Sequence, residues 1–280
     1  MTGQGLPRAH SIRDALAAFL TPDAPVIIAR LASVEGSAPR EEGTYMLVSP
    51  DRIHGTIGGG FAEYETIAHA RQMLRDSRAS DERTIILGPD SGQCCGGRLT
   101  VSFTALTTDL RTELLAEAQE EEAARRPVMI FGAGHVGKAI AAALVPLPMA
   151  VTVVETREAE LEGLPSGVTT LLSAMPEAEL AALPPGAAVL ILTHDHALDF
   201  LIAREALLID GLSYVGMIGS ATKRASFAGH FKREGGDAAR LDRLVLPIGG
   251  SRVRDKRPAV IAAMVAAELL CLPPFPVIID

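Results

Sequence analysis

Two adjacent cysteines in a glycine-rich turn are the residues best suited to do chemistry in this chain. They are Cys94 and Cys95, in the stretch DSGQCCGGRLTV, residues 90–101. Zinc sites use spaced cysteine pairs and two further ligands, and the Cα atoms of neighbouring residues lie only about 3.8 Å apart, too close for an ordinary disulfide. The pair therefore suits a soft metal, a sulfur-rich cofactor or a persulfide. The alternative is one buried cysteine with an incidental neighbour.

A glycine fingerprint forms the second candidate site. Gly132, Gly134 and Gly137 follow an apolar strand and open a helix, and Glu155 ends the next strand. We expect Gly132 to allow a tight turn, Gly134 to let a pyrophosphate approach, and Gly137 to let helix and strand pack closely. Glu155 could then bind the ribose diol of NAD. The packing roles need no ligand, so the pattern predicts a Rossmann fold and leaves bound nucleotide open.

Two further loops could bind an anion. Gly58, Gly59 and Gly60 precede a helix in TIGGGFAEYE, residues 56–65, where backbone amides and the helix dipole favour negative charge. The alternative is a sharp turn that needs positive φ. Arg40 lies in a loop rich in proline and glycine and could clamp a phosphate, or could simply be solvated.

A pair of histidines follows the fourth predicted strand of the second half. His194 and His196 could form a metal pair or supply a general base. The alternative is that Asp195 or Thr193 caps the next helix while the histidines face water. The following strand-to-helix junction also suits an anion, through Gly219, Ser220, Lys223 and Arg224.

The elements that position these residues fall into three parts. Residues 1–106 form a mixed α/β domain, with strands predicted at 24–34, 44–50, 83–88 and 98–106 and a helix at 61–77. A charged connecting helix follows in 107–126, and Pro127 ends it. The apolar stripe of this connecting helix is Leu110, Leu114 and Leu115. The helix at 61–77 is expected to carry an apolar face, made roughly by Phe61, Tyr64, Ile67, Ala68 and Met73.

Residues 127–280 alternate apolar strands with helices, which predicts a Rossmann-like domain with a parallel sheet. Its last helix, residues 259–270, is apolar almost all round, so we expect it in the core or at a subunit contact. Cys271 is expected to be a small core residue. The fold class is therefore α/β, with a mixed domain before a Rossmann-like one.

The composition narrows the class of protein. The chain has 280 residues and a net charge of −8, without a cluster of Lys and Arg that would indicate nucleic acid. Its longest uncharged stretch has 16 residues, short of the roughly 20 that span a bilayer. The N-terminal apolar run is too short for a signal peptide, and three cysteines suit a reducing compartment. We expect a cytoplasmic protein without membrane or nucleic-acid partners.

Together the motifs resemble the xanthine dehydrogenase accessory protein family, XdhC/CoxI. They run from about residue 33 to 263 in the family's order, and the matching stretches are EGSAPREEGTYMLV, GTIGGGFAEYE, GQCCGG, FGAGHVGKAI, LTHDHALD, YVGMIGSATKR and PIGG with DKRPAVIAA. The resemblance implies an XdhC/CoxI-type domain followed by a Rossmann domain. It implies a chaperone without turnover that binds molybdenum cofactor (molybdopterin), holds it during sulfuration and helps to insert it into a xanthine dehydrogenase-type apoenzyme.

The resemblance also implies partners and site residues. Cys94 and Cys95 would contact the cofactor or handle sulfur from a cysteine desulfurase, while Arg40 or the glycine turns would host its phosphate. We expect a homodimer. The competing hypothesis is an NAD-dependent oxidoreductase, with Glu155 on the ribose and His194 or His196 as proton donor.

Overall fold

The computed structural model describes residues 12–21, 24–87, 97–250 and 252–275. Cys94 and Cys95 lie outside these described residues. The chain divides into two compact units, Ile12–Gln119 and a second unit that begins at Glu120. We call them the N-terminal and the C-terminal unit. No helix in the described ranges combines the length and the apolar character that crossing a membrane requires.

The N-terminal unit contains an antiparallel sheet whose described strands follow the order β3-β2-β1-β5-β4. The central strand β1 (Ile27–Glu35) pairs with β2 (Tyr45–Val48) and with β5 (Arg98–Ala105). The edges are β3 (Ile53–Gly55), which the sequence analysis did not predict, and β4 (Ser80–Ile86). All four predicted strands are present.

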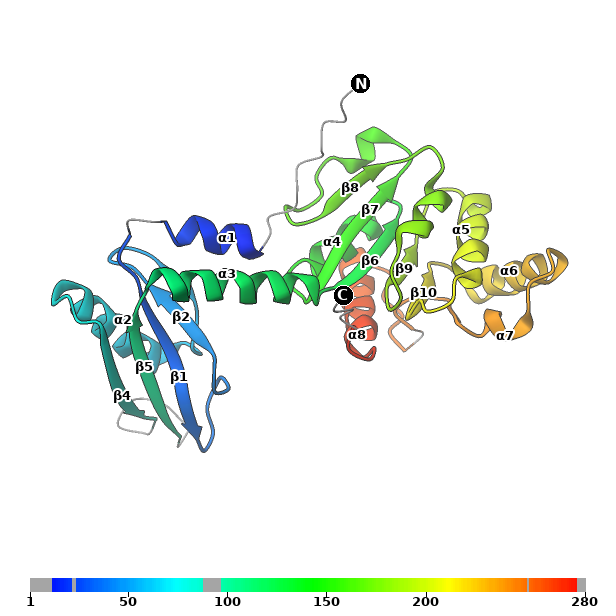
Figure 1. Ribbon diagram of the computed structural model, residues 1–280. Helices are drawn as coiled ribbons and strands as arrows, with labels where there is room; N and C mark the ends of the chain where they lie inside the picture. The colour runs from blue at the N-terminus through cyan, green and yellow to red at the C-terminus, as the bar shows by residue number, and fades with distance from the viewer. Residues whose placement is uncertain (1–11, 22–23, 88–96, 251, 276–280) are drawn as a thin grey trace, which may run out of the picture. The chain divides into compact units, whose positions relative to one another are not determined.

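Side chains of β1 alternate between two cores, as expected for a strand covered on both faces. Ile27 and Ala29 face the core under helix α2 (Gly60–Arg75). Ile28 faces the core formed with α1 (Ile12–Phe19) and α3 (Thr108–Ala123). Figure 1 shows these helices around the blue and cyan strands. The predicted stripe of α3 is confirmed, because Leu110, Leu114 and Leu115 all pack into this second core.

Only part of the apolar face predicted for α2 is buried. Phe61 and Tyr64 are 42% and 75% exposed, and Ala68 is exposed as well. The residues that α2 buries are Ala62, Thr66, His69, Ala70 and Met73. Four of these five are small or polar residues that a ranking by hydrophobicity passes over, although Ala lets a helix axis approach a sheet closely. Of the predicted face, Met73 is buried and Ile67 is partly buried against the same core.

The C-terminal unit contains a parallel sheet in the order β11-β10-β9-β6-β7-β8 among its described strands. Its first strand, β6 (Arg126–Phe131), lies in the middle, with β7 (Met149–Glu155) on one side and β9 (Ala188–Ile191) on the other. The outer strands are β8 (Thr169–Leu172), β10 (Tyr214–Met217) and β11 (Leu244–Val245). This order reverses between β6 and β9, where doubly wound sheets bind ligands, and it confirms the Rossmann-like prediction.

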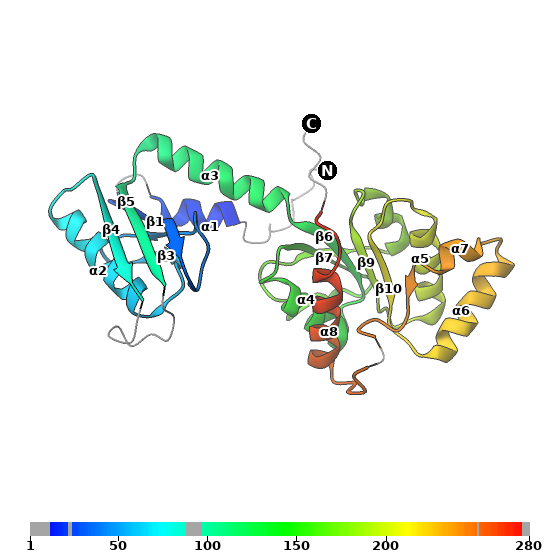
Figure 2. The ribbon, with the colours of Figure 1, turned by 90° about the horizontal axis from the view of Figure 1, so that it is seen from below.

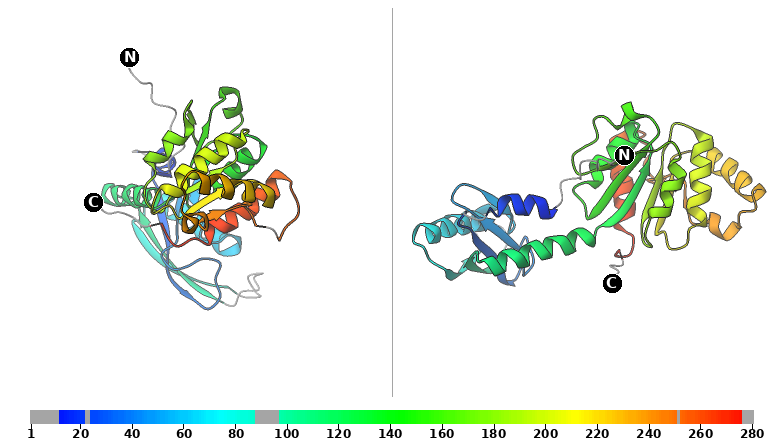
Figure 3. Two further views of the ribbon diagram at one scale, coloured as in Figure 1. Left: turned by 90° about the vertical axis from the view of Figure 1, so that its right-hand side faces the viewer. Right: turned by 45° about the horizontal axis from the view of Figure 1, so that its top comes forward.

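Helices cover both faces of the parallel sheet. On one face lie α4 (His135–Leu144) and α8 (Pro258–Leu270), and on the other α5 (His196–Leu208) and α6 (Ala221–Arg233). Figure 2 shows β9 and β10 between these two groups of helices, and Figure 3 shows the same sheet from two further sides. The short segments η2 (Glu158–Leu161), η3 (Pro176–Ala182) and α7 (Ala238–Leu241) complete the described elements.

The prediction for Cys271 is wrong, because its side chain is exposed. Helix α8 does contribute to the core, but through one stripe made by Ala262, Val265, Ala266 and Leu269. Cys271 comes two residues after Leu269, which is about half a turn off that stripe. The residue caps the helix, and its amide donates to the carbonyls of Ala267 and Glu268.

Candidate functional site

The glycine turn before α2 has the backbone conformation that only glycine adopts readily. Gly58, Gly59 and Gly60 have φ of 121°, 78° and 66°, so the predicted positive-φ turn is confirmed. The turn already holds an anion, because one carboxylate oxygen of Glu63 accepts hydrogen bonds from the amides of Ile57 and Gly59, each at 3.1 Å.

The Thr56 hydroxyl and the Gly58 amide complete the hydrogen bonds around the Glu63 carboxylate. The Thr56 hydroxyl also donates to the same Glu63 oxygen, and the Gly58 amide donates to the Thr56 hydroxyl at 3.1 Å. An external oxyanion could reach the amides of Ile57 and Gly59 only in exchange for Glu63. Sequence reasoning missed Glu63, although a carboxylate in the first turn of a helix is a recognisable signal.

The loop after β1 brings Arg40 to the glycine turn. A Cβ atom at Gly58 would lie 2.8 Å from Pro39 Cβ and 3.4 Å from Arg40 Cγ, so backbone and loop are in close contact here. The Arg40 side chain is exposed. Its guanidinium is therefore accessible to a ligand beside the turn.

The same loop contacts the start of β5. A side chain at Gly97 would collide with the Ser37 carbonyl oxygen and lie 3.1 Å from the Glu35 carbonyl oxygen. The Leu87 amide donates to the Gly97 carbonyl at 2.8 Å, so Leu87 and Gly97 are neighbours. Residues 88–96, which include Cys94 and Cys95, connect these two positions. The loop with Arg40 therefore contacts both the glycine turn and one end of the cysteine segment.

The glycine fingerprint in the C-terminal unit forms the turn from β6 to α4. Gly132 has φ of 108°, and a Cβ there would lie 2.8 Å from the Leu192 carbonyl carbon. A Cβ at Gly137 would lie 3.1 Å from the Gly132 carbonyl carbon. The predicted roles of these two glycines in turn and packing are confirmed. Gly134 has nothing within 4 Å of its Cβ position, so the backbone there is open.

Glu155 lies at the end of β7, 3% exposed. Its carboxylate accepts from the Ala133 amide at 2.9 Å, from the Thr156 amide at 2.9 Å and from the Arg157 side chain at 3.2 Å. Burial alone would raise its pKa, but hydrogen bonds from Arg157 and the backbone outweigh this and lower the pKa from 4.5 to about 2. The carboxylate thus fastens the glycine loop, and a ribose diol could reach it only if Arg157 moved away.

Helix α5 begins at a side-chain cap. The Asp195 carboxylate accepts from the amides of Ala197 at 2.7 Å and Leu198 at 3.4 Å, so the predicted cap is confirmed for Asp195. His194 and His196 are exposed. Together with Thr193, Asp199, Ser220 and Lys223 they line a pocket of about 320 Å³ at the carboxyl ends of β9 and β10. We call it the β9–β10 pocket.

The structure places the remaining candidate, Arg224, away from these groups. Its guanidinium donates to the carbonyls of Leu244 at 2.8 Å and Leu246 at 3.3 Å. Arg224 therefore connects α6 to β11 and its continuation. Within the described ranges no cluster of three or more His, Cys, Asp or Glu side chains could hold a metal ion.

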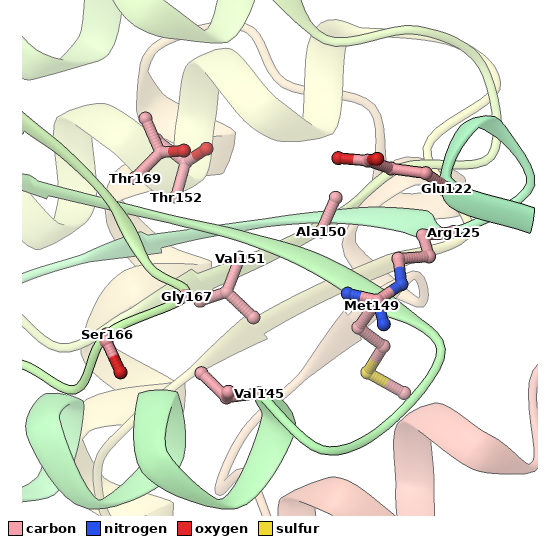
Figure 4. A pocket seen from close by; sticks show the side chains of 10 residues that line it. All are labelled: Glu122, Arg125, Val145, Met149, Ala150, Val151, Thr152, Ser166, Gly167 and Thr169. Atoms are coloured by element: carbon pink, nitrogen blue, oxygen red, sulfur yellow. The ribbon is translucent and has the colours of Figure 1, made fainter. Parts of the chain in front are cut away.

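Another pocket, of about 300 Å³, lies at the amino ends of β7 and β8. Figure 4 shows Glu122 and Arg125 on one side of it and Ser166, Thr152 and Thr169 on the other. This is the edge of the sheet opposite to the glycine loop. Ligands of doubly wound sheets bind at the carboxyl edge, so we assign it no role.

The fold and these sites define a two-unit α/β protein, in which a mixed sheet unit precedes a Rossmann-type unit. The chain belongs to the XdhC and CoxI family. The family model described as XdhC Rossmann domain matches residues 128–269, and the model described as XdhC and CoxI family matches residues 20–85. Each model falls on one of the two units.

Two further comparisons show what the chain is similar to. The protein YqeB of Escherichia coli (strain K12) is 28% identical over 255 residues, which cover 88% of this chain and 43% of YqeB. The chain thus spans less than half the length of that relative. The crystal structure of a Bacillus halodurans protein described as a xanthine dehydrogenase has a TM-score of 0.75 at 19% identity, covering 93% of this chain and 95% of that chain. At this identity the likeness shows a shared fold.

Proposed function

We propose that this protein binds molybdenum cofactor, holds it while its terminal ligand is sulfurated, and helps to insert it into a xanthine dehydrogenase-type apoenzyme. Membership of the XdhC and CoxI family supports a role in the maturation of such enzymes. The observation that carries the cofactor proposal is the loop of Arg40, which contacts both the glycine turn and Gly97 at the end of the cysteine segment.

The residues fit the two chemical ends of this cofactor. A molybdopterin phosphate suits the exposed guanidinium of Arg40, and the turn at Gly59 binds the Glu63 carboxylate, so it has the geometry for an oxyanion. The dithiolene-held molybdenum supplies a soft, sulfur-rich centre when the cofactor is bound. Thiolates of Cys94 and Cys95 suit such a centre and could carry sulfur from a cysteine desulfurase as a persulfide.

The test is anoxic cofactor loading. Purified protein is incubated with freshly released molybdenum cofactor and separated on a sizing column, and molybdenum and pterin are measured per chain. We expect near-stoichiometric loading of the wild type and strong loss in Cys94→Ala or Cys95→Ala, without a change in thermal stability. Cys271→Ala is the matched control, because it removes an exposed thiol from the other unit.

Two outcomes would contradict the proposal. If neither Cys94→Ala nor Cys95→Ala loads less cofactor than Cys271→Ala, the two thiols have no role in binding. If the wild type binds NAD tightly and no molybdenum cofactor, the oxidoreductase hypothesis replaces the chaperone. NAD binding is therefore measured in the same experiment.

A further inference from the structure

The β9–β10 pocket contains a buried ion pair that the proposed function does not use. Asp199 is 0% exposed, and its carboxylate accepts from Lys223 Nζ at 2.5 Å. The other carboxylate oxygen accepts from the Thr193 amide at 2.9 Å and the Thr193 hydroxyl at 2.7 Å. Both oxygens of Asp199 are thus used inside the protein, where they fix the position of the lysine.

Lys223 retains a donor for a ligand. An ammonium group has three N–H donors, and the described acceptors of Nζ are Asp199 and the Ile218 carbonyl at 3.1 Å. The side chain is only 11% exposed, yet it lines the pocket. The third N–H is therefore left for a group inside the pocket.

The backbone is adapted to hold this lysine in place. Gly219 has no side chain, and a Cβ there would lie 2.6 Å from Lys223 Cδ and 3.2 Å from Lys223 Cβ. The lysine stem occupies the space of that missing side chain. A larger residue at position 219 would force the Lys223 stem to shift. Glycine at position 219 therefore leaves the space that the Lys223 side chain occupies.

Other donors surround the same space. Ser220 caps α6 and lines the pocket beside the exposed imidazoles of His194 and His196. Helix α6 carries no acidic residue in its first turn, so the positive end of its dipole is not offset there. No arginine lines the pocket among the described residues. A lysine binds phosphate as a point charge, and the hydroxyl of Ser220 and the imidazoles of His194 and His196 can donate further hydrogen bonds to its oxygens.

We infer that the β9–β10 pocket binds the phosphomonoester group of a small-molecule ligand, with Lys223 as its charged donor. The volume of about 320 Å³ falls at the lower end of small-molecule pockets, about 300–1,000 Å³, so it has room for part of the ligand beyond the phosphate. The pocket adjoins the glycine loop, because a Cβ at Gly132 would lie 3.1 Å from Thr193 Cα. This inference does not depend on the proposed function.

The test is calorimetric titration of the full chain with inorganic phosphate and with 5′-AMP, followed by competition between them. We expect both to bind at one site. Lys223→Gln should weaken both by about tenfold or more, because it removes a hydrogen bond to a charged group. Since Lys223→Gln leaves Asp199 buried without its partner charge, which destabilises proteins strongly, the double variant Asp199→Asn/Lys223→Gln is measured in parallel.

Lys232→Gln is the matched control. Lys232 lies on the same helix, is exposed and lines no part of this pocket, so its loss changes the charge equally and should leave affinity within about twofold. AMP binding more tightly than phosphate would indicate a nucleotide, and equal affinity would indicate another phosphomonoester such as a pterin phosphate. The inference is wrong if the wild type does not bind phosphate, or if acetate competes as well as AMP does. It is also wrong if Lys232→Gln and the double variant lose the same amount of phosphate affinity.

Discussion

Glu155 holds a charge in the interior of the C-terminal unit, next to the open backbone at Gly134. Its hydrogen bonds lower the pKa to about 2, below the ordinary value of 4.5. A carboxyl group whose folded pKa is depressed stabilises the fold at pH values above its unfolded pKa. That contribution falls as the pH drops from about 4.5 towards 2. The hydrogen bonds of the Glu155 carboxylate to the glycine loop therefore stabilise the fold in a pH-dependent way.

Replacing Glu155 by Gln should therefore destabilise the protein most at neutral pH. We expect a loss of up to about 3 kcal/mol at pH 7 in the free energy of unfolding, shrinking as the pH falls below 4.5. Urea unfolding at pH 7, 4 and 3 measures this difference. Glu158→Gln, an exposed neighbour, should change stability little at any of them. A destabilisation by Glu155→Gln that is equal at all three values would contradict the ion-pair account.

Sequence patterns revealed the glycines and the basic residues of the candidate sites, but not the carboxylates that form hydrogen bonds with them. Asp199 and Glu63 decide what Lys223 and the turn at Gly59 can bind. Glu63 has a local signal in the sequence, because it lies in the first turn of a helix. Asp199 meets Lys223 only through the tertiary fold, and such a partner leaves no periodic signal in the sequence.

At the level of elements, the two outer glycines of the fingerprint differ from the middle one. Gly132→Ala should lower the free energy of unfolding by about 2–3 kcal/mol, because it places a side chain at positive φ against Leu192. Gly134→Ala should stay within about 1 kcal/mol of wild type, because φ is −67° there and its Cβ position is open. Thermal unfolding of the two variants compares them. Equal destabilisation would refute the distinction.

The elements themselves were largely predictable, and the failures have physical reasons. Long apolar runs such as β1 and β6 carry a strong signal. The strands β3 and β11 have three and two residues, too few for any period to show. The buried face of α2 was predicted only in part, at Ile67 and Met73. Packing against the sheet also buries small and polar residues of this helix, while Phe61 and Tyr64 stay exposed.

At the level of the whole molecule, each unit has its own hydrophobic cores. Each is large enough to unfold as a unit of its own. We expect calorimetry to resolve two unfolding transitions. Glu63→Ala should lower only one of them, by removing the acceptor for Ile57 and Gly59, and Glu155→Gln only the other. A single transition shifted by both variants would show that the units unfold together.

The exposed thiol of Cys271 at the end of α8 affects how self-association has to be measured. In air, such thiols from two chains can oxidise to an intermolecular disulfide, which would yield a covalent dimer unrelated to any native interface. Sedimentation of a Cys271→Ser variant under reductant therefore separates the expected homodimer from an oxidation product. It also leaves Cys94 and Cys95 as the only thiols in the chain, so that thiol titration would count these two alone.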